Sequence, residues 1–245
     1  MAELTPMMQQ YFEIKNKNKD YILFYRLGDF YEMFFDDAKL VSRELELTLT
    51  GRDCGQGERA PMCGVPYHSA EGYIAKLVQK GYKIAICEQM EDPKKAKGLV
   101  KREIIRRVTP GTVVEASMLD ENRNNFLGCV YAAGGSVGVC FADITTGSVY
   151  ATGSDNWNDI TSEFGRFAPR EVLVGGGAIS ADSLQSFLKE RLEALIEPMP
   201  EECFEAQRSA ERIQEHFKVQ DFDAAGLTDL PCTVQCLGGL LDYLE

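Results

Sequence analysis

The sequence predicts an α/β protein built of two domains, and three observations lead to this prediction. The 245 residues are 44% hydrophobic and 26% charged, which is the balance of a globular chain long enough to bury two ordinary cores. Short apolar runs alternate with segments of helical periodicity along the chain. A polar stretch from Thr109 to Asn125 separates residues 1–115, with 18 Lys and Arg against 17 Asp and Glu, from residues 116–245, with 8 against 21.

The first domain is predicted over residues 1–115. A helix should begin at Thr5 and Pro6, because a capping hydroxyl followed by proline favours a helix N-terminus. Apolar residues then recur at helical spacing from Asp29, which is the expected cap of a second helix. The other expected elements are a strand at residues 21–27, a second strand at 45–50, a loop at 51–66, a helix at 69–81 and two more strands at 82–87 and 103–108.

The second domain is predicted over residues 126–245, after a linker at residues 116–125. Three strands joined by glycine turns predict an antiparallel meander, at residues 126–133, 137–145 and 148–152. A helix from about Ser154, a strand at 171–174 and helices from about Ser180 and around Gln207 and Val234 should follow. This is the element order of a ribonuclease-H-like domain. The last helical pattern has no stop signal, and we therefore expect the full protein to continue beyond Glu245.

Composition also argues against several classes of protein. No segment approaches the roughly 20 apolar residues of a membrane helix, and no secretion signal opens the chain, which predicts a cytoplasmic protein. The eight cysteines are scattered, and the closest pair, Cys232 and Cys236, has helical spacing, so we expect reduced thiols and no metal site. The sequence G-x-x-x-x-G-K-[ST] is absent, so no nucleotide hydrolysis is expected.

The run Leu23–Phe34, with the sequence L-F-Y-R-L-G-D-F-Y-E-M-F, closely resembles the mismatch-recognition segment of the MutS family of DNA mismatch-repair proteins. Three more blocks continue the resemblance in order, at Ala60–His68, Ala85–Gln89 and Arg107–Thr112. In that family the G-D-F-Y-E core supplies a wedging phenylalanine and a base-contacting glutamate. The resemblance therefore implies a mismatch-recognition domain followed by a connector domain, with Phe30 as the wedge and Glu32 as the base contact.

The chemistry of these two side chains suits that function. A mispaired step is poorly stacked, and an aromatic ring entering the minor groove can open it where a matched step resists, since unstacking costs roughly a few kcal/mol per step. A carboxylate beside DNA is useful only if it accepts a hydrogen bond from an exposed base. The alternative from the local pattern is a capping box formed by Asp29 and Glu32, with Phe30 and Tyr31 as core residues.

Further residues are candidates for contact with the DNA backbone or groove. Each of them either has a cationic side chain or lies in the predicted loop, at residues 61–66. The cations would position the protein on phosphates, and glycine lets the backbone approach closely. These candidates are Arg52, Met62, Gly64, Lys101, Arg102, Arg106 and Arg107. Only the first domain has the local charge balance that suits DNA, whereas the acidic second domain should repel it.

The resemblance also implies what this chain lacks. The family's ATPase, levers and clamp lie downstream of Glu245, so ATP and Mg²⁺ belong to the full-length family, and no cofactor or catalytic residue is expected here. The implied partners are mismatched double-stranded DNA and a MutL-type protein that docks on the connector domain. Full-length members are homodimers of the bacterial cytoplasm, associated with the nucleoid. The oligomeric state of this chain by itself stays open.

Two alternatives come from other classes of function. A metal-dependent nuclease could be centred on Asp143, since ribonuclease-H-like enzymes hold two metal ions with strand and helix carboxylates. The placement of Asp143 on the second strand and the acidity of the domain argue against it, and Glu171 is expected to be a solvated charge. The other alternative is a noncatalytic module that recruits a repair partner through the second domain.

Overall fold

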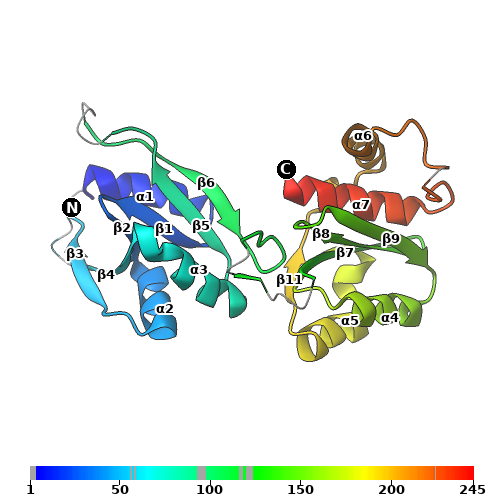
Figure 1. The fold of residues 1–245 in the computed structure, drawn as a ribbon, viewed down its shortest axis with the longest axis horizontal. Helices are drawn as coiled ribbons and strands as arrows, with labels where there is room; N and C mark the ends of the chain where they lie inside the picture. Colours follow the sequence, from blue (N-terminus) through cyan, green and yellow to red (C-terminus); the bar gives the residue numbers. More distant parts are fainter. Residues whose placement is uncertain are drawn as a thin grey trace. The chain divides into compact units, whose positions relative to one another are not determined.

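The computed structural model describes residues 4–55, 57, 59–92, 98–115, 118–119, 124–223 and 225–245. The chain forms two compact units, Met1–Pro110 and Gly111–Glu245, and each unit contains one β-sheet (Figure 1). The units divide within the turn at Thr109–Thr112 rather than after residue 115, and most of the predicted linker at residues 116–125 lies outside the described residues. None of the described helices has the length and apolar character needed to cross a membrane.

The first unit is a six-stranded sheet in the order β3-β4-β2-β1-β5-β6. Its strands are β1 (Ile22–Leu27), β2 (Phe30–Phe34), β3 (Thr50–Asp53), β4 (Arg59–Pro66), β5 (Ile84–Gln89) and β6 (Arg102–Val108). Its helices are α1 (Pro6–Asn16), α2 (Phe35–Leu45), the short η1 (Tyr67–Ser69) and α3 (Ala70–Gln79). Helix α1 covers the sheet face that carries Tyr25 and Phe34, through Met8 and Tyr11.

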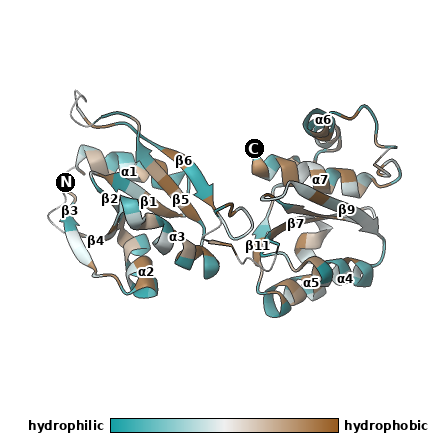
Figure 2. Cartoon of the chain, viewed as in Figure 1, coloured by the Kyte–Doolittle hydropathy of each residue, from teal (hydrophilic) through white to brown (hydrophobic). Residues whose placement is uncertain are grey.

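Several predicted elements of this unit are confirmed. The Thr5 hydroxyl caps α1 by accepting a hydrogen bond from the Met8 N–H at 3.4 Å. The buried strand β1, helix α3 and strands β5 and β6 lie within two residues of their predicted bounds. Figure 2 colours much of the edge strand β6 as hydrophilic, in keeping with its sequence R-E-I-I-R-R-V.

The predicted helix from Asp29 is wrong over its first turn and a half. Residues Phe30–Phe34 form β2, which pairs with β1 on one side and β4 on the other, and α2 begins only at Phe35. The two-residue turn Gly28-Asp29 joins β1 to β2, with Gly28 at φ +58°, as a glycine at the first position of a tight hairpin requires. Asp29 is therefore a turn residue and not a helix cap.

The predicted strand at residues 45–50 and the predicted loop at 51–66 are also corrected. Helix α2 continues to Leu45 and ends with Glu46 in the left-handed region, at φ 55°. The segment read as a loop forms the hairpin of β3 and β4, where Arg52 lies opposite Ala60. Glycine and proline content favours loops locally, but pairing of β4 with both β2 and β3 satisfies its backbone groups and fixes it as a strand.

The second unit is a five-stranded sheet in the order β11-β10-β7-β8-β9. Its strands are β7 (Phe126–Ala133), β8 (Ser136–Asp143), β9 (Ser148–Ser154), β10 (Glu171–Gly176) and β11 (Leu195–Pro198). Its helices are α4 (Trp157–Phe167), η3 (Gly177–Ser180), α5 (Asp182–Ser186), η4 (Phe187–Arg191), η5 (Glu201–Phe204), α6 (Ala206–Phe217) and α7 (Pro231–Leu244). Strands β7, β8 and β9 are antiparallel, and β10 and β11 run parallel to β7.

This strand order confirms the predicted ribonuclease-H-like architecture. The glycine turns lie where they were expected, with positive φ at Gly134, Gly135 and Gly147. Strand β11 was not predicted, because four residues between two helical segments give a weak periodic signal. Helix α7 packs on one face of the sheet and α4 and α5 on the other, each over its own apolar cluster (Figure 1).

Candidate nucleic-acid interface

The β1–β2 hairpin presents Phe30 at the surface of the first unit. Phe30 directly follows the Gly28-Asp29 turn and is 46% exposed, whereas Tyr31, Met33 and Phe34 are buried. Phe30 and Phe34 lie on the same face of β2, but the ring of Phe34 packs 5.1 Å from that of Tyr11 on α1. The prediction that both Phe30 and Tyr31 are core residues is therefore correct for Tyr31. It is wrong for Phe30, whose apolar ring is exposed to solvent at the tip of the hairpin.

Arg26 braces this hairpin from the opposite face of the sheet. Its Nε donates to the Gly28 carbonyl at 2.6 Å, and its guanidinium lies 3.6 Å from the centre of the Tyr67 ring. The same guanidinium donates to the Glu88 carboxylate on β5 at 3.2 Å. In addition, the Tyr67 N–H donates to the Asp29 carbonyl at 3.0 Å. The turn before Phe30 is thus tied to both β5 and η1.

The Glu88 carboxylate joins a second side chain to this brace, because the Tyr31 hydroxyl also donates to it. Burial, and then this hydrogen bond, raise the pKa of Tyr31, so the phenol stays protonated and remains a donor. Arg26, Tyr67 and Glu88 were not among the site residues predicted from the sequence. The available signal was that all three lie inside the blocks that carry the family resemblance.

Glu32 forms an ion pair with Arg52, with 2.6 Å between Oε2 of Glu32 and Nη1 of Arg52. The side chain of Glu32 is 13% exposed and that of Arg52 39% exposed. Gly64 is the Cα partner of Glu32 on β4, and a Cβ there would lie 3.3 Å from the Tyr31 carbonyl oxygen and 3.5 Å from Glu32 Cγ. The missing side chain at residue 64 leaves room for Glu32 to reach across β4 to β3. The capping-box alternative for Glu32 is wrong, because residue 32 lies in a strand.

Strand pairing gathers five of the predicted site residues on one face of the sheet. Met62 is the Cα partner of both Phe34 and Thr50, and Gly64 is two residues further along β4. Because side chains alternate along strands, the residues of this row point to the same face. The row contains Phe30, Glu32, Arg52, Met62 and Gly64. Its chemistry combines an exposed aromatic ring, a carboxylate and a half-exposed guanidinium.

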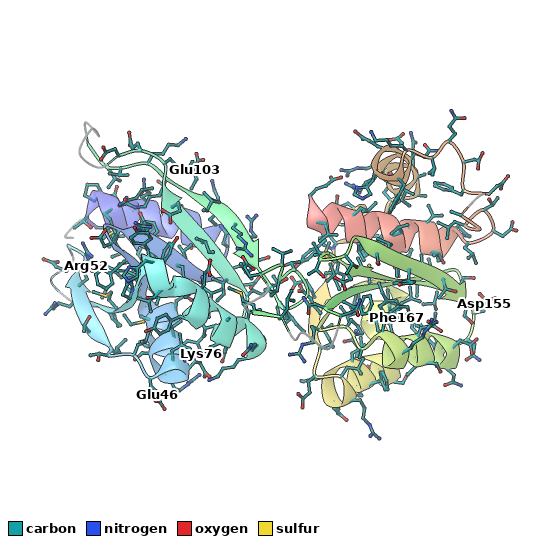
Figure 3. The ribbon with its side chains drawn as sticks, viewed as in Figure 1. Glu46, Arg52, Lys76, Glu103, Asp155 and Phe167 are labelled. Atoms are coloured by element: carbon teal, nitrogen blue, oxygen red, sulfur yellow. The ribbon has the colours of Figure 1, made fainter. Side chains whose placement is uncertain are left out.

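The predicted cationic contacts on β6 and at Lys101 just before it lie away from this row of residues. Strand β6 forms the edge of the sheet opposite β3, and Figure 3 shows Arg52 and Glu103 on opposite sides of the first unit. Lys101 pairs with Glu103 at 2.5 Å, which raises the pKa of the lysine. Arg107 donates to the Asn18 amide oxygen at 3.0 Å, and Arg106 is half-buried.

A contact with DNA requires an exposed guanidinium, and Arg102 does not provide one. It is buried, and its guanidinium donates to the Arg26 carbonyl at 2.8 Å and to Gln10 Oε1 and the Val100 carbonyl at 3.0 Å. These acceptors belong to the protein interior, so Arg102 ties β6 to β1 and α1. We assign it a structural role.

Two carboxylates of the second unit are held by internal hydrogen bonds. Asp143 accepts from Asn124 Nδ2 at 2.8 Å and from the Thr145 N–H and hydroxyl at 2.9 and 2.6 Å. Glu171 is fully buried rather than solvated as predicted, because it begins β10, an interior strand between β11 and β7. It accepts from the Gly111 N–H at 2.8 Å and from the Tyr243 hydroxyl at 2.6 Å. Within the described residues, neither carboxylate belongs to a group of three converging metal ligands.

Comparisons with known proteins match both halves of the chain. The family model described as MutS domain I matches residues 5–117, and that described as MutS domain II matches residues 125–245. The chain is 50% identical to the DNA mismatch repair protein MutS of Acetivibrio thermocellus over 250 residues, covering 100% of this chain and 28% of that protein. It is also 50% identical to the MutS proteins of Lachnoclostridium phytofermentans and Ruminiclostridium cellulolyticum, covering 100% of this chain and 26% and 28% of theirs. The chain thus spans little more than a quarter of the length of the curated relatives it matches.

Proposed function

Because the chain belongs to the MutS family of DNA mismatch-repair proteins, we propose that its first unit recognises mispaired or unpaired bases in duplex DNA by inserting Phe30 into the minor groove. The observation that carries the proposal is the exposed Phe30 ring at the tip of a hairpin braced by Arg26. A wedge must push against stacked bases, and a fixed backbone transmits that force. A poorly stacked mispaired step yields at a lower cost than a matched one.

Glu32 is proposed as the residue that discriminates among bases. In the absence of DNA its carboxylate is neutralised by Arg52, which limits the repulsion that a lone carboxylate would exert on approaching phosphates. Arg52 is 39% exposed, so an approaching phosphate can reach its guanidinium and compete with Glu32 for it. Glu32 is then released to accept a hydrogen bond from a base that the wedge has displaced.

The remaining site residues fall into two groups. Met62 and Gly64 share the face of Phe30 and Glu32, and we propose that they line the groove beside the wedge. Lys101, Arg106 and Arg107 lie on or beside the far edge strand and are proposed as phosphate contacts that orient the unit on the duplex. Arg102 is left out of this set, because its donors serve the interior.

The test is fluorescence-anisotropy binding at low salt, using the full 245-residue chain with matched, G·T-mismatched and single-base-bulge duplexes. Low salt matters because phosphate contacts weaken steeply with ionic strength. The expected result is a preference for mispaired DNA that Phe30→Ala removes. Tyr150→Ala is the matched control, because Tyr150 is a similarly exposed aromatic residue, at 47%, in the second unit. An unchanged preference in Phe30→Ala would contradict the wedge.

For the second unit we propose a noncatalytic connector role with a docking surface for a MutL-type partner. The charge of its sequence supports this role, since a strongly acidic unit repels DNA. Binding of the full chain to an immobilised MutL protein by surface plasmon resonance tests it, and the absence of binding would contradict it. We propose that this chain itself performs no catalysis, with ATP, Mg²⁺ and homodimerisation belonging to full-length proteins at the bacterial nucleoid.

The nuclease alternative has a direct test. It predicts cleavage of duplex DNA in the presence of Mg²⁺ or Mn²⁺ that Asp143→Asn abolishes. The geometry disfavours it, because both carboxylate oxygens of Asp143 accept hydrogen bonds from Asn124 and Thr145. Intact DNA after incubation with either ion would exclude the nuclease.

A further inference from the structure

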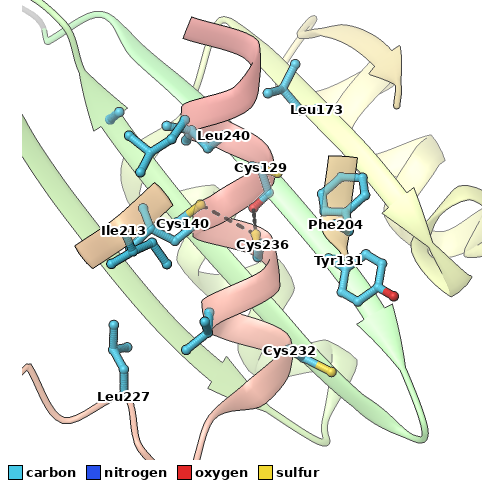
Figure 4. Close-up of a cluster of buried hydrophobic side chains, with 14 of the residues drawn as sticks. Cys129, Tyr131, Cys140, Leu173, Phe204, Ile213, Leu227, Cys232, Cys236 and Leu240 are labelled. Carbon is cyan, nitrogen blue, oxygen red and sulfur yellow. Dashed lines mark hydrogen bonds between the residues drawn. The ribbon is translucent and has the colours of Figure 1, made fainter. Parts of the chain in front are cut away.

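Three thiols from three separate elements meet in the core of the second unit. Cys129 on β7 and Cys140 on β8 are Cα partners, and Cys236 reaches them from α7. The three Sγ atoms all lie within 4.8 Å of one another, and those of Cys140 and Cys236 are 3.4 Å apart. Cys236 Sγ also lies 3.1 Å from the Cys129 carbonyl oxygen (Figure 4).

The backbone builds this convergence. A Cβ at Gly138 on β8 would lie 2.3 Å from the Cys232 carbonyl oxygen, so α7 rests directly on the strand backbone at this point. Cys232 is one helical turn before Cys236, and Gly138 is two residues before Cys140 on the same face of β8. The close approach of the helix at Gly138 therefore delivers the Cys236 sulfur to the strand sulfurs.

The surroundings of the thiols are apolar. All three are fully buried, and the described members of their cluster are apolar or thiol side chains, apart from the phenol of Tyr131. Burial among apolar side chains disfavours a thiolate here, and a bound cation would supply positive charge to stabilise it.

We propose that Cys129, Cys140 and Cys236 form a binding site for one Cu(I) ion. Thiolates select soft ions, and Cu(I) accepts two or three sulfur ligands, whereas structural zinc sites take four in a tetrahedron. Each thiol that coordinates copper releases its proton to the solvent, and no electron is transferred. This site is independent of the proposed DNA binding.

The test uses the full chain, reduced and kept free of oxygen, mixed with Cu(I) in the presence of the chelator bicinchoninate. Because the sulfurs are buried, copper is offered both to the native chain and during refolding from denaturant. After gel filtration, atomic absorption gives the copper bound per chain. We expect one copper per wild-type chain and none in Cys140→Ala or Cys236→Ala.

Two control variants retain all three proposed ligands. Cys87→Ala removes a fully buried thiol of the first unit, and Cys203→Ser removes a half-buried thiol of the second. Both should keep one copper per chain. A melting curve with and without Cu(I) gives a second readout, since a ligand that binds the folded state raises the melting temperature of the wild type and both controls but not of Cys236→Ala.

Two results would overturn the site. One is a wild-type chain that retains no copper by either route, which would leave the thiols as small apolar packing groups. The other is equal copper retention by the wild type and by folded Cys140→Ala and Cys236→Ala, which would place the copper on other thiols.

Discussion

The Glu32 carboxylate and the Arg52 guanidinium form an ion pair across β4, 2.6 Å apart. The β4 residue that pairs with Glu32 is Gly64, which has no side chain to separate the two groups. Glu32 and Arg52 are 20 positions apart in the sequence and lie on strands that do not pair directly with each other. The contact joins the proposed base-reading carboxylate to a cation that can bind a phosphate. Several expectations about DNA binding depend on this pair.

Arg52→Ala should weaken binding to matched and mismatched duplexes alike if Arg52 contacts a phosphate. The slope of log K against log salt should then fall by about one unit. Anisotropy titrations at several salt concentrations measure this slope. Arg43→Ala, which removes an exposed cation on α2, is the control and should leave the slope unchanged. A lower mismatch preference with an unaltered slope would mean that Arg52 acts only by holding Glu32.

Gly64→Ala should displace the Glu32 side chain, because the added Cβ meets the Tyr31 carbonyl at 3.3 Å and Glu32 Cγ at 3.5 Å. We expect reduced discrimination between mismatched and matched DNA and a loss of stability of about 1 kcal/mol. Gly72→Ala in α3 is the control, since nothing lies within 4 Å of its added Cβ and alanine favours a helix by about 1 kcal/mol. Discrimination equal to that of the wild type would show that the side chain of Glu32 tolerates the methyl group.

Arg26→Lys should loosen the hairpin that carries Phe30. Lysine keeps the charge but loses the planar stacking on Tyr67 and the simultaneous bonds to Gly28 and Glu88. Faster hydrogen exchange at residues 27–31 and a weaker mismatch preference are expected, with Phe30 itself intact. Lys39→Arg, at an exposed site on α2, should change neither quantity. Unaltered exchange at the hairpin would rule out the bracing role of Arg26.

Gly138→Ala should destabilise the second unit, because the added Cβ would lie 2.3 Å from the Cys232 carbonyl oxygen and would push α7 off the sheet. Overpacking of this kind costs about 1–3 kcal/mol. Denaturant unfolding measures the loss. Gly165→Ala on α4 meets its nearest neighbour, Phe187, at 3.8 Å and should be neutral or stabilising. Equal stability of the two variants would argue against direct packing of α7 on β8.

Asp37 should make the stability of the first unit depend on pH. Burial raises the pKa of this carboxyl above its ordinary value of 3.8, despite its bonds to the Leu23 N–H and Lys15. The folded state therefore holds the proton more tightly than the unfolded state, and this contribution to stability is present below pH 3.8 and is lost as pH rises through the folded pKa. Thermal melts of the wild type and Asp37→Asn between pH 3 and 6 should show the wild type losing stability relative to the variant. A constant difference across this range would contradict the raised pKa.

Features that depend on short stretches of sequence were predicted from those stretches. The Thr5-Pro6 start of α1, the glycine turns of the β7–β9 meander and the charge difference between the two halves all lie in short stretches of chain. The hairpin of β1 and β2 had such a signal as well, in the Gly28-Asp29 pair between apolar runs. Helical spacing of the residues that follow outweighed it, and the prediction for residues 30–34 was wrong.

The sequence by itself determined the two-domain α/β organisation, the ribonuclease-H-like strand order and the family to which the chain belongs. The tertiary structure alone decided that residues 30–34 form a strand with Phe30 exposed, that Arg102 and Glu171 are buried, and that Cys129, Cys140 and Cys236 converge. Turns and helix caps depend on residues a few positions apart, whereas strand partners and buried side chains depend on groups that lie tens of residues away. The sequence pattern contains the first kind of information, and only the packed chain brings the second kind together.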